Sequence, residues 1–187
     1  DAESHTAVCL MRLLLRRRFG VDPEVIDFNA RERTSGAEMI EWPEAVLMIG
    51  DKVVTDSPPA VRYPHQLDLG ECWKEMTGLP FVYAVWTCRE TDVESDAVRL
   101  AASILDRQRR HNATRLGWLV TQRAPARGWP VDLAHHYVED LLRFDIGPAG
   151  SRFRQTIDAF LDMAHEERLI STRRPLRWLE PAPTCHA

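Results

Sequence analysis

The chain has 187 residues, with 24 Lys and Arg against 28 Asp and Glu, and 44% of its residues are apolar. This composition is ordinary for a globular protein and excludes a disordered, collagen-like or coiled-coil chain. A formal net charge of −4 gives no general attraction for nucleic acid or for an anionic membrane. The longest apolar runs are far shorter than the roughly 20 residues that cross a bilayer, so the composition favours neither a nucleic-acid-binding nor a membrane-spanning protein.

The cysteines and histidines show no pattern of a metal site. The four cysteines lie far apart without a CxxC pair, so neither a zinc framework nor a redox motif is expected. The histidines have no spacing that would bring three ligands together. We expect reduced thiols, with Cys9 and Cys88 in the core; the other two are Cys72 and Cys185.

A leucine-rich run near the start of the chain has the spacing of an amphipathic helix. The periodicity predicts a helix over 4–18, with Ser4 as its N-cap and Gly20 as its stop. Three consecutive arginines at 16–18 fall in its last turns, where cations suit the negative end of the helix dipole. The first element of the chain is therefore predicted to be a helix.

Three apolar runs have the pattern of β-strands. They lie at 25–28, at 44–51, where the run ends in Gly50-Asp51, and at 79–86. Continuous apolar runs are typical of parallel strands that are covered on both faces. The first half of the chain therefore predicts an α/β arrangement.

The rest of the chain has the pattern of helices without a further strand. A short helix over 68–76 is predicted to begin at Asp68 and to close at Gly78. Helices need a sheet to cover and parallel strands need neighbours, so we expect part of the protein to lie before residue 1, which is Asp rather than Met. The later helices are predicted over 93–110, 133–144 and 153–167, followed by an irregular tail over 175–187.

The segment from Asp68 to Trp86, which reads DLGECWKEMTGLPFVYAVW, resembles the chorismate dehydratases of the futalosine route to menaquinone. The opening Asp-x-x-Ser-x-Thr resembles a second motif of that family. The sequence departs from the family pattern at three positions. His5 stands where the family usually has Arg, Ala7 replaces a hydroxyl residue, and Cys72 replaces an acidic one.

The resemblance implies an α/β fold similar to type II periplasmic binding proteins, in which two lobes enclose a ligand in a cleft. On this basis 1–82 form the second α/β lobe, and 83–187 form the crossover and the carboxy-terminal helices that pack on the first lobe. The amino-terminal part of that first lobe would lie upstream, together with an asparagine that is important for catalysis in the family. We therefore assign no catalytic residue in this sequence, and we expect the chain by itself to be inactive and poorly folded.

The resemblance also implies an activity. It implies a cytoplasmic lyase that dehydrates chorismate to 3-[(1-carboxyvinyl)oxy]benzoate in menaquinone biosynthesis, with no metal or organic cofactor. We expect chorismate as its small-molecule partner, and neither nucleic acid nor a membrane. Ser4, His5 and Thr6 are predicted to bind a substrate carboxylate at the amino terminus of the first helix. Asp51 is predicted to reach the cleft from the carboxyl end of a strand.

Each of these residues has a structural interpretation as well. Ser4 caps its own helix in that interpretation, His5 is a surface residue, and Asp51 is a turn residue that bonds to its own backbone. A choice between core and cleft also applies to three aromatic residues: Trp73, Phe81 and Trp86.

Two other classes of protein remain open. A solute-binding protein for a small carboxylate would share this fold, and its upstream sequence would carry a secretory or lipoprotein leader. The effector-binding lobe of a transcription regulator would carry a helix-turn-helix upstream. The motif over 68–86 favours the dehydratases over both.

Overall fold

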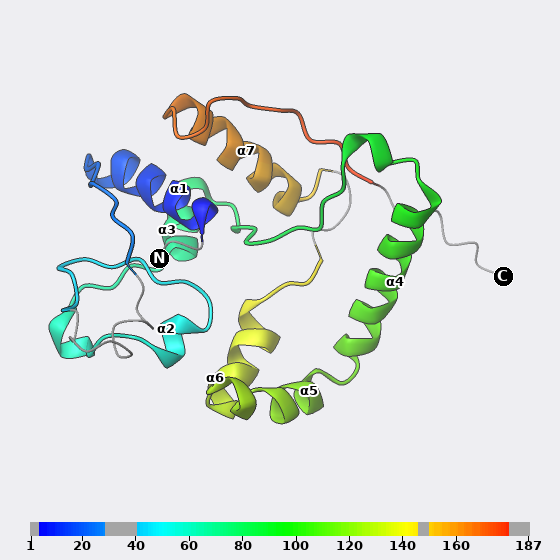
Figure 1. Cartoon of the computed structure of the whole chain (residues 1–187), viewed down its shortest axis with the longest axis horizontal. Coiled ribbons are helices and arrows are strands. Elements are labelled where there is room, and N and C mark those ends of the chain that lie inside the picture. The colour runs from blue at the N-terminus through cyan, green and yellow to red at the C-terminus, as the bar shows by residue number, and fades with distance from the viewer. Residues whose placement is uncertain (1–3, 29–40, 146–149, 180–187) are drawn as a thin grey trace.

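A computed structural model of the chain describes residues 4–28, 41–145 and 150–179 (Figure 1). The regular elements within these ranges are helical, and none of the helices there is long and apolar enough to cross a membrane. The α-helices are α1 (His5–Leu14), α2 (Lys52–Thr55), α3 (Leu69–Thr77), α4 (Asp96–Ala113), α5 (Leu116–Arg123), α6 (Val131–His135) and α7 (Arg152–Glu166). Two π-helical turns are η1 (Leu15–Phe19) and η6 (His136–Leu141). Three 3₁₀ turns are η3 (Ala60–Arg62), η4 (Glu90–Asp92) and η5 (Pro125–Arg127).

The first helix forms where the sequence predicts it. The Ser4 hydroxyl accepts a hydrogen bond from the backbone N–H of Ala7 at 3.1 Å, which is the geometry of an N-cap. The α-helix passes into the π-helical turn η1 and ends at Gly20, whose φ of 65° is open to glycine at little cost. The predicted cap and stop are both confirmed.

The boundaries of α3 are also set by residues at the two ends of the helix. Asp68 accepts a hydrogen bond from the Glu71 N–H at 2.8 Å, and Gly78 closes the helix with a φ of 71°. The three later predicted helices are confirmed with small shifts in their ends, as α4, as α6 continued by η6, and as α7. The described part of the tail is irregular as expected, whereas 180–187 lie outside the described residues.

The predicted strands are wrong for the part of the chain that the structure describes. Residues 25–28, 44–49 and 79–86 run as irregular backbone, and Gly50-Asp51 form a turn. A strand exists only as part of a ladder of hydrogen bonds with a neighbour, and no second strand is present in the described ranges to supply one. The apolar pattern alone therefore does not make a sheet here.

The main core lies between α1, α3 and α7, which pack together (Figure 1). Trp73 of α3 is fully buried, and its indole N–H donates to the hydroxyl of Thr156 on α7 at 2.7 Å. The other buried members of this cluster are Cys72 of α3 and three leucines of α1: Leu10, Leu13 and Leu14.

Charged groups join η1, the turn that continues α1, to the end of α7. Arg17 pairs with Glu166 at 2.6 Å and with Glu167 at 2.9 Å, while Arg16 donates to the Glu167 carbonyl oxygen at 2.7 Å. Hydrogen bonding to Glu166 is the main cause of the raised pKa of Arg17. These contacts connect the two predicted parts of the chain, 1–82 and 83–187, whose division stays a prediction.

A second, smaller cluster lies between α5 and α6. Val120, Ala124 and Ala134 are its buried members, and Trp129 packs against them. Helix α5 was not predicted from the sequence, because Gly117 and Thr121 favour helix only weakly and the helix depends on this tertiary packing. By contrast, α4 has no buried side chain within the described structure and runs along the edge of the molecule (Figure 1).

The cysteines are distributed differently from the prediction. Cys72 is buried, Cys9 is half-buried and Cys88 is exposed, and all three are free thiols. The prediction that Cys88 lies in the core is wrong, because it is exposed on irregular backbone that follows 79–86. Burial raises the pKa of the Cys9 and Cys72 thiols, which disfavours the reactive thiolate. Cys185 lies outside the described residues.

The hydrogen bond between Trp73 and Thr156 gives a test of this core. We expect Thr156→Val to lower the free energy of unfolding by about 1–3 kcal/mol, because it leaves the buried indole N–H without an acceptor. Thr156→Ser keeps the hydroxyl and is the matched control, expected to retain more of that stability. Urea denaturation measures both, and equal losses in the two variants would contradict the assignment.

Candidate functional site

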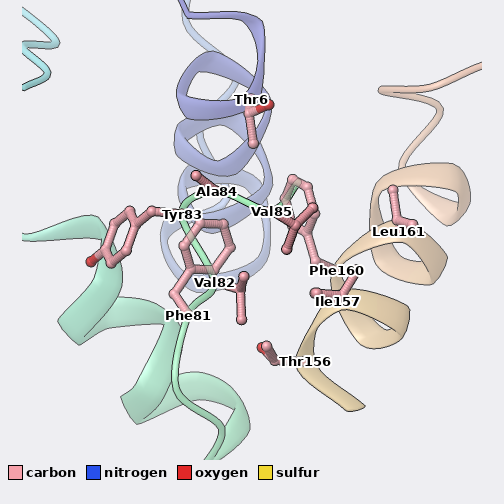
Figure 2. Close-up of a pocket in the computed structure, with 10 residues that line it drawn as sticks. All are labelled: Thr6, Phe81, Val82, Tyr83, Ala84, Val85, Thr156, Ile157, Phe160 and Leu161. Atoms are coloured by element: carbon pink, nitrogen blue, oxygen red, sulfur yellow. The ribbon is translucent and has the colours of Figure 1, made fainter. Parts of the chain in front are cut away.

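A groove lies between the first turn of α1, the segment over 81–85 and one face of α7 (Figure 2). Its volume is about 310 Å³. Hydrophobic side chains make up most of its lining, with a few polar groups among them. The lining residues are Thr6, Phe81, Val82, Tyr83, Ala84, Val85, Thr156, Ile157, Phe160 and Leu161.

Aromatic rings fix the apolar side of this groove. Phe81 and Phe160 meet edge to face, with ring centroids 5.4 Å apart, and both rings contact the buried indole of Trp73. Edge-to-face pairs are a favourable arrangement of aromatic quadrupoles. The hydrogen bond from Trp73 to Thr156 holds this set of rings against α7, so the wall is a packed part of the core.

The amino terminus of α1 borders the same groove. Thr6 is in the first turn of this helix and also lines the groove. The first amides of a helix have no acceptor within it and carry partial positive charge, which favours an anion beside them. The Ser4 hydroxyl already accepts the Ala7 N–H, so the role that the structure shows for Ser4 is that of a cap.

The predicted site residues do not all come together. Thr6 lines the groove, Ser4 caps the helix beside it, and His5 is exposed. Asp51 is not among the lining residues; its carboxylate accepts a hydrogen bond from the Trp129 indole N–H at 2.9 Å. The role of these four residues in binding substrate stays a prediction.

The aromatic residues that the sequence left between core and cleft have different positions. Trp73 is core, Phe81 lines the groove, and Trp86 is 84% exposed. Tyr83 and Phe160 were not singled out from the sequence, although both line the groove. No alternation in the sequence marks Tyr83, because all five consecutive residues of 81–85 line the groove.

Tyr83 turns its hydroxyl toward the first turn of α3 (Figure 2). The hydroxyl lies so close to Gly70 that a methyl group at that position would collide with it. Although Tyr83 is 62% exposed, the packing of its hydroxyl end buries the ionisable group and raises the pKa to about 12, with the carboxylate of Asp68 adding to the effect. At neutral pH this phenol is therefore a hydrogen-bond donor and not a base.

The described residues contain no group of three or more His, Cys, Asp or Glu side chains that are placed to hold a metal ion. The chemistry available at the groove is accordingly that of hydroxyl groups, helix amides and apolar surface. Such a set of groups suits a ligand that carries a carboxylate on a small carbon skeleton.

Comparison with known proteins shows the family to which the chain belongs. Residues 1–166 match the family described as "Menaquinone biosynthesis", so the chain belongs to that family. It is also similar to the chorismate dehydratase of Thermus thermophilus, with 30% identity over 150 residues, which cover 73% of this chain and 52% of that protein. The resemblance to the chorismate dehydratases is thereby confirmed. The chain spans about half the length of this relative. No solved structure matches the chain.

The raised pKa of Tyr83 predicts how stability depends on pH. An unfolded chain loses the phenolic proton near its ordinary value of 10.0, whereas the folded protein holds it to about 12. The free energy of unfolding should therefore fall as the pH rises from about 10 to about 12. We expect Tyr83→Phe to show a smaller fall than the wild type in urea titrations over this range.

The two proteins compared at pH 7 provide the baseline, because the phenol is protonated there in both the folded and the unfolded wild-type chain. A fall of the same size in Tyr83→Phe and in the wild type above pH 10 would show that the Tyr83 hydroxyl is not in the packed position against α3.

Proposed function

We propose that this protein dehydrates chorismate to 3-[(1-carboxyvinyl)oxy]benzoate on the futalosine route to menaquinone, in the cytoplasm and without a metal or organic cofactor. The family of the chain supports a role in menaquinone biosynthesis. The observation that carries the proposal is the position of Thr6, which lies both in the first turn of α1 and in the wall of an apolar groove (Figure 2).

The groove and the helix terminus offer what the two parts of chorismate need. A carboxylate at the first turn of α1 would accept hydrogen bonds from helix amides and from the Thr6 hydroxyl, with the helix dipole adding a favourable field. The ring would lie against the apolar wall that includes Phe81 and Phe160. Ser4 would act by holding the turn in shape, and exposed His5 would stand at its outer side.

The proposed reaction is an elimination of water. The C–O bond to the ring hydroxyl breaks, an adjacent ring C–H bond gives up its proton, and the electron pair of that bond completes an aromatic ring. The proton and the hydroxide leave together as water. Because aromaticity makes the product favourable, the protein has mainly to orient the substrate and to assist the departing hydroxide.

The base for this step is proposed to be the side-chain carboxylate of the substrate. The described residues that line the groove include neither a carboxylate nor an imidazole, and Tyr83 is protonated at neutral pH. The protein group that assists the departing hydroxide would then be a residue other than the described lining residues. The asparagine that the resemblance implies upstream is the candidate for this role.

The same lack of an acid or a base in the described lining favours a second candidate, a solute-binding protein for a small carboxylate. The two functions differ in one measurement. A dehydratase converts chorismate to a product with the absorbance of a benzoate, whereas a binding protein returns chorismate unchanged after equilibrium dialysis.

The first test of the proposal is Thr6→Val in the full-length protein. This change keeps the shape of the side chain and removes the hydroxyl of a residue that lines the groove. We expect kcat/KM for chorismate to fall about 10- to 100-fold, the effect of a lost hydrogen bond to a charged group. Unchanged kcat/KM would remove Thr6 from the binding site.

The second test separates capping from binding at Ser4. Ser95 is the control because it also caps a helix: its hydroxyl accepts a hydrogen bond from the Ala97 N–H at 3.2 Å at the start of α4. Ser4→Ala and Ser95→Ala should each cost about 1 kcal/mol of stability, but only Ser4→Ala should lower kcat/KM. Equal effects of the two changes on kcat/KM would contradict a site at the first turn of α1.

A further inference from the structure

Asp51 has partners that the site described above does not use. Its Oδ1 accepts a hydrogen bond from the Trp129 indole N–H at 2.9 Å, and its Oδ2 lies 3.5 Å from the guanidinium of Arg127. The two carboxylate oxygens thus face two different side chains of one loop. The hydrogen bond from the indole to the carboxylate is charge-assisted and directional, whereas the ion pair joins two exposed side chains and contributes less.

The backbone of both segments is shaped for this contact. Asp51 follows Gly50, which has a φ of 63°, in the turn that begins α2. On the other side η5 closes at Gly128 with a φ of 74°, and a Cβ built there would lie 3.2 Å from the methyl group of Thr55. Glycine therefore allows the loop to approach α2 closely while Trp129 extends toward Asp51.

Trp129 is itself held by the cluster between α5 and α6. Its backbone N–H donates to the Ala124 carbonyl oxygen at 3.0 Å, and its ring lies 5.4 Å from that of Tyr137. Burial is the main cause of the raised pKa of Tyr137, and the carboxylates of Asp68 and Asp51 contribute. The indole is consequently a fixed donor, anchored in a packed unit that is far from Asp51 in the sequence.

We propose that Asp51 is a latch between the turn at 50–55 and the α5–α6 unit, with Trp129 as its positioning residue, and that the Asp51 carboxylate does not bind the substrate. In the predicted division of the chain the latch would connect the part over 1–82 with the part over 83–187. Its consequence for catalysis rests on the proposed function, but the contact itself can be tested without any activity.

The direct test uses the indole N–H signals of the intact ¹⁵N-labelled protein, which has six tryptophans. Trp129→Phe removes one signal and so assigns it, while keeping an aromatic ring against Tyr137. In Asp51→Ala we expect the assigned signal to shift and its N–H to exchange with solvent about 10-fold faster. Asp51→Asn, whose amide oxygen still accepts a hydrogen bond, should restore most of the protection.

Asp106 supplies the matched control for the loss of a paired carboxylate, because it pairs with Arg109 at 2.8 Å and Arg110 at 3.1 Å on α4. Asp106→Ala should leave the Trp129 signal and its exchange rate unchanged. A Trp129 signal that does not respond to Asp51→Ala, or that responds equally to Asp106→Ala, would overturn the latch.

Kinetics in the full-length enzyme then distinguish a latch from a substrate ligand. For a latch, Asp51→Ala and Trp129→Phe change the same kinetic parameter, and the double variant is no worse than the poorer single one. Trp118→Phe, a change to an exposed tryptophan on α5, is the control and should add to Asp51→Ala independently. A rise in KM with Asp51→Ala alone, while Trp129→Phe behaves as the wild type, would make Asp51 a ligand and overturn the proposal.

Failure of the proposed function would look different. A wild-type protein without dehydratase activity would refute the reaction, and the indole N–H measurements would still decide whether Asp51 and Trp129 are joined.

Discussion

The buried hydrogen bond between Trp73 and Thr156 is the contact on which the described structure depends most. It joins α3 to α7, which are far apart in the sequence, and both side chains are almost completely removed from solvent. A buried indole N–H needs an acceptor, so the register of α7 against α3 is fixed by one hydroxyl. The same contact sets the aromatic wall of the groove, because the rings of Phe81 and Phe160 pack on that indole.

The parts of the fold that depend on local chemistry could be predicted from the sequence. Ser4 and Asp68 cap their helices, and Gly20 and Gly78 end them, because each of these residues acts within a few positions of itself. The strands could not be predicted in this way. The apolar run over 79–86 satisfies the pattern of a strand, but a strand also needs a neighbour whose position no local pattern reveals.

In the candidate site, too, the features that depend on neighbouring residues could be predicted, and those that depend on distant residues could not. The first turn of α1 was found because a serine cap and a leucine-rich run mark it in the sequence, and the structure adds the apolar wall beside it. Asp51 looked equivalent in the sequence, since it follows an apolar run that ends in glycine. Its indole partner is 78 positions away, so only the folded chain distinguishes an available carboxylate from an occupied one.

The exposed position of α4 in the described structure has a consequence for proteolysis of the chain. In the described structure α4 has no buried side chain and is held closed by its own propensity, its Ser95 cap and the ion pairs of Asp106, so in the chain by itself it should open locally at small cost. It carries four arginines in its length, at 99, 107, 109 and 110, which makes it an inviting target for trypsin. A cut there would leave α7 on the second fragment while it remains packed on α1 and α3 of the first, so the nicked protein would run as two bands on a denaturing gel and still elute as one species from a sizing column.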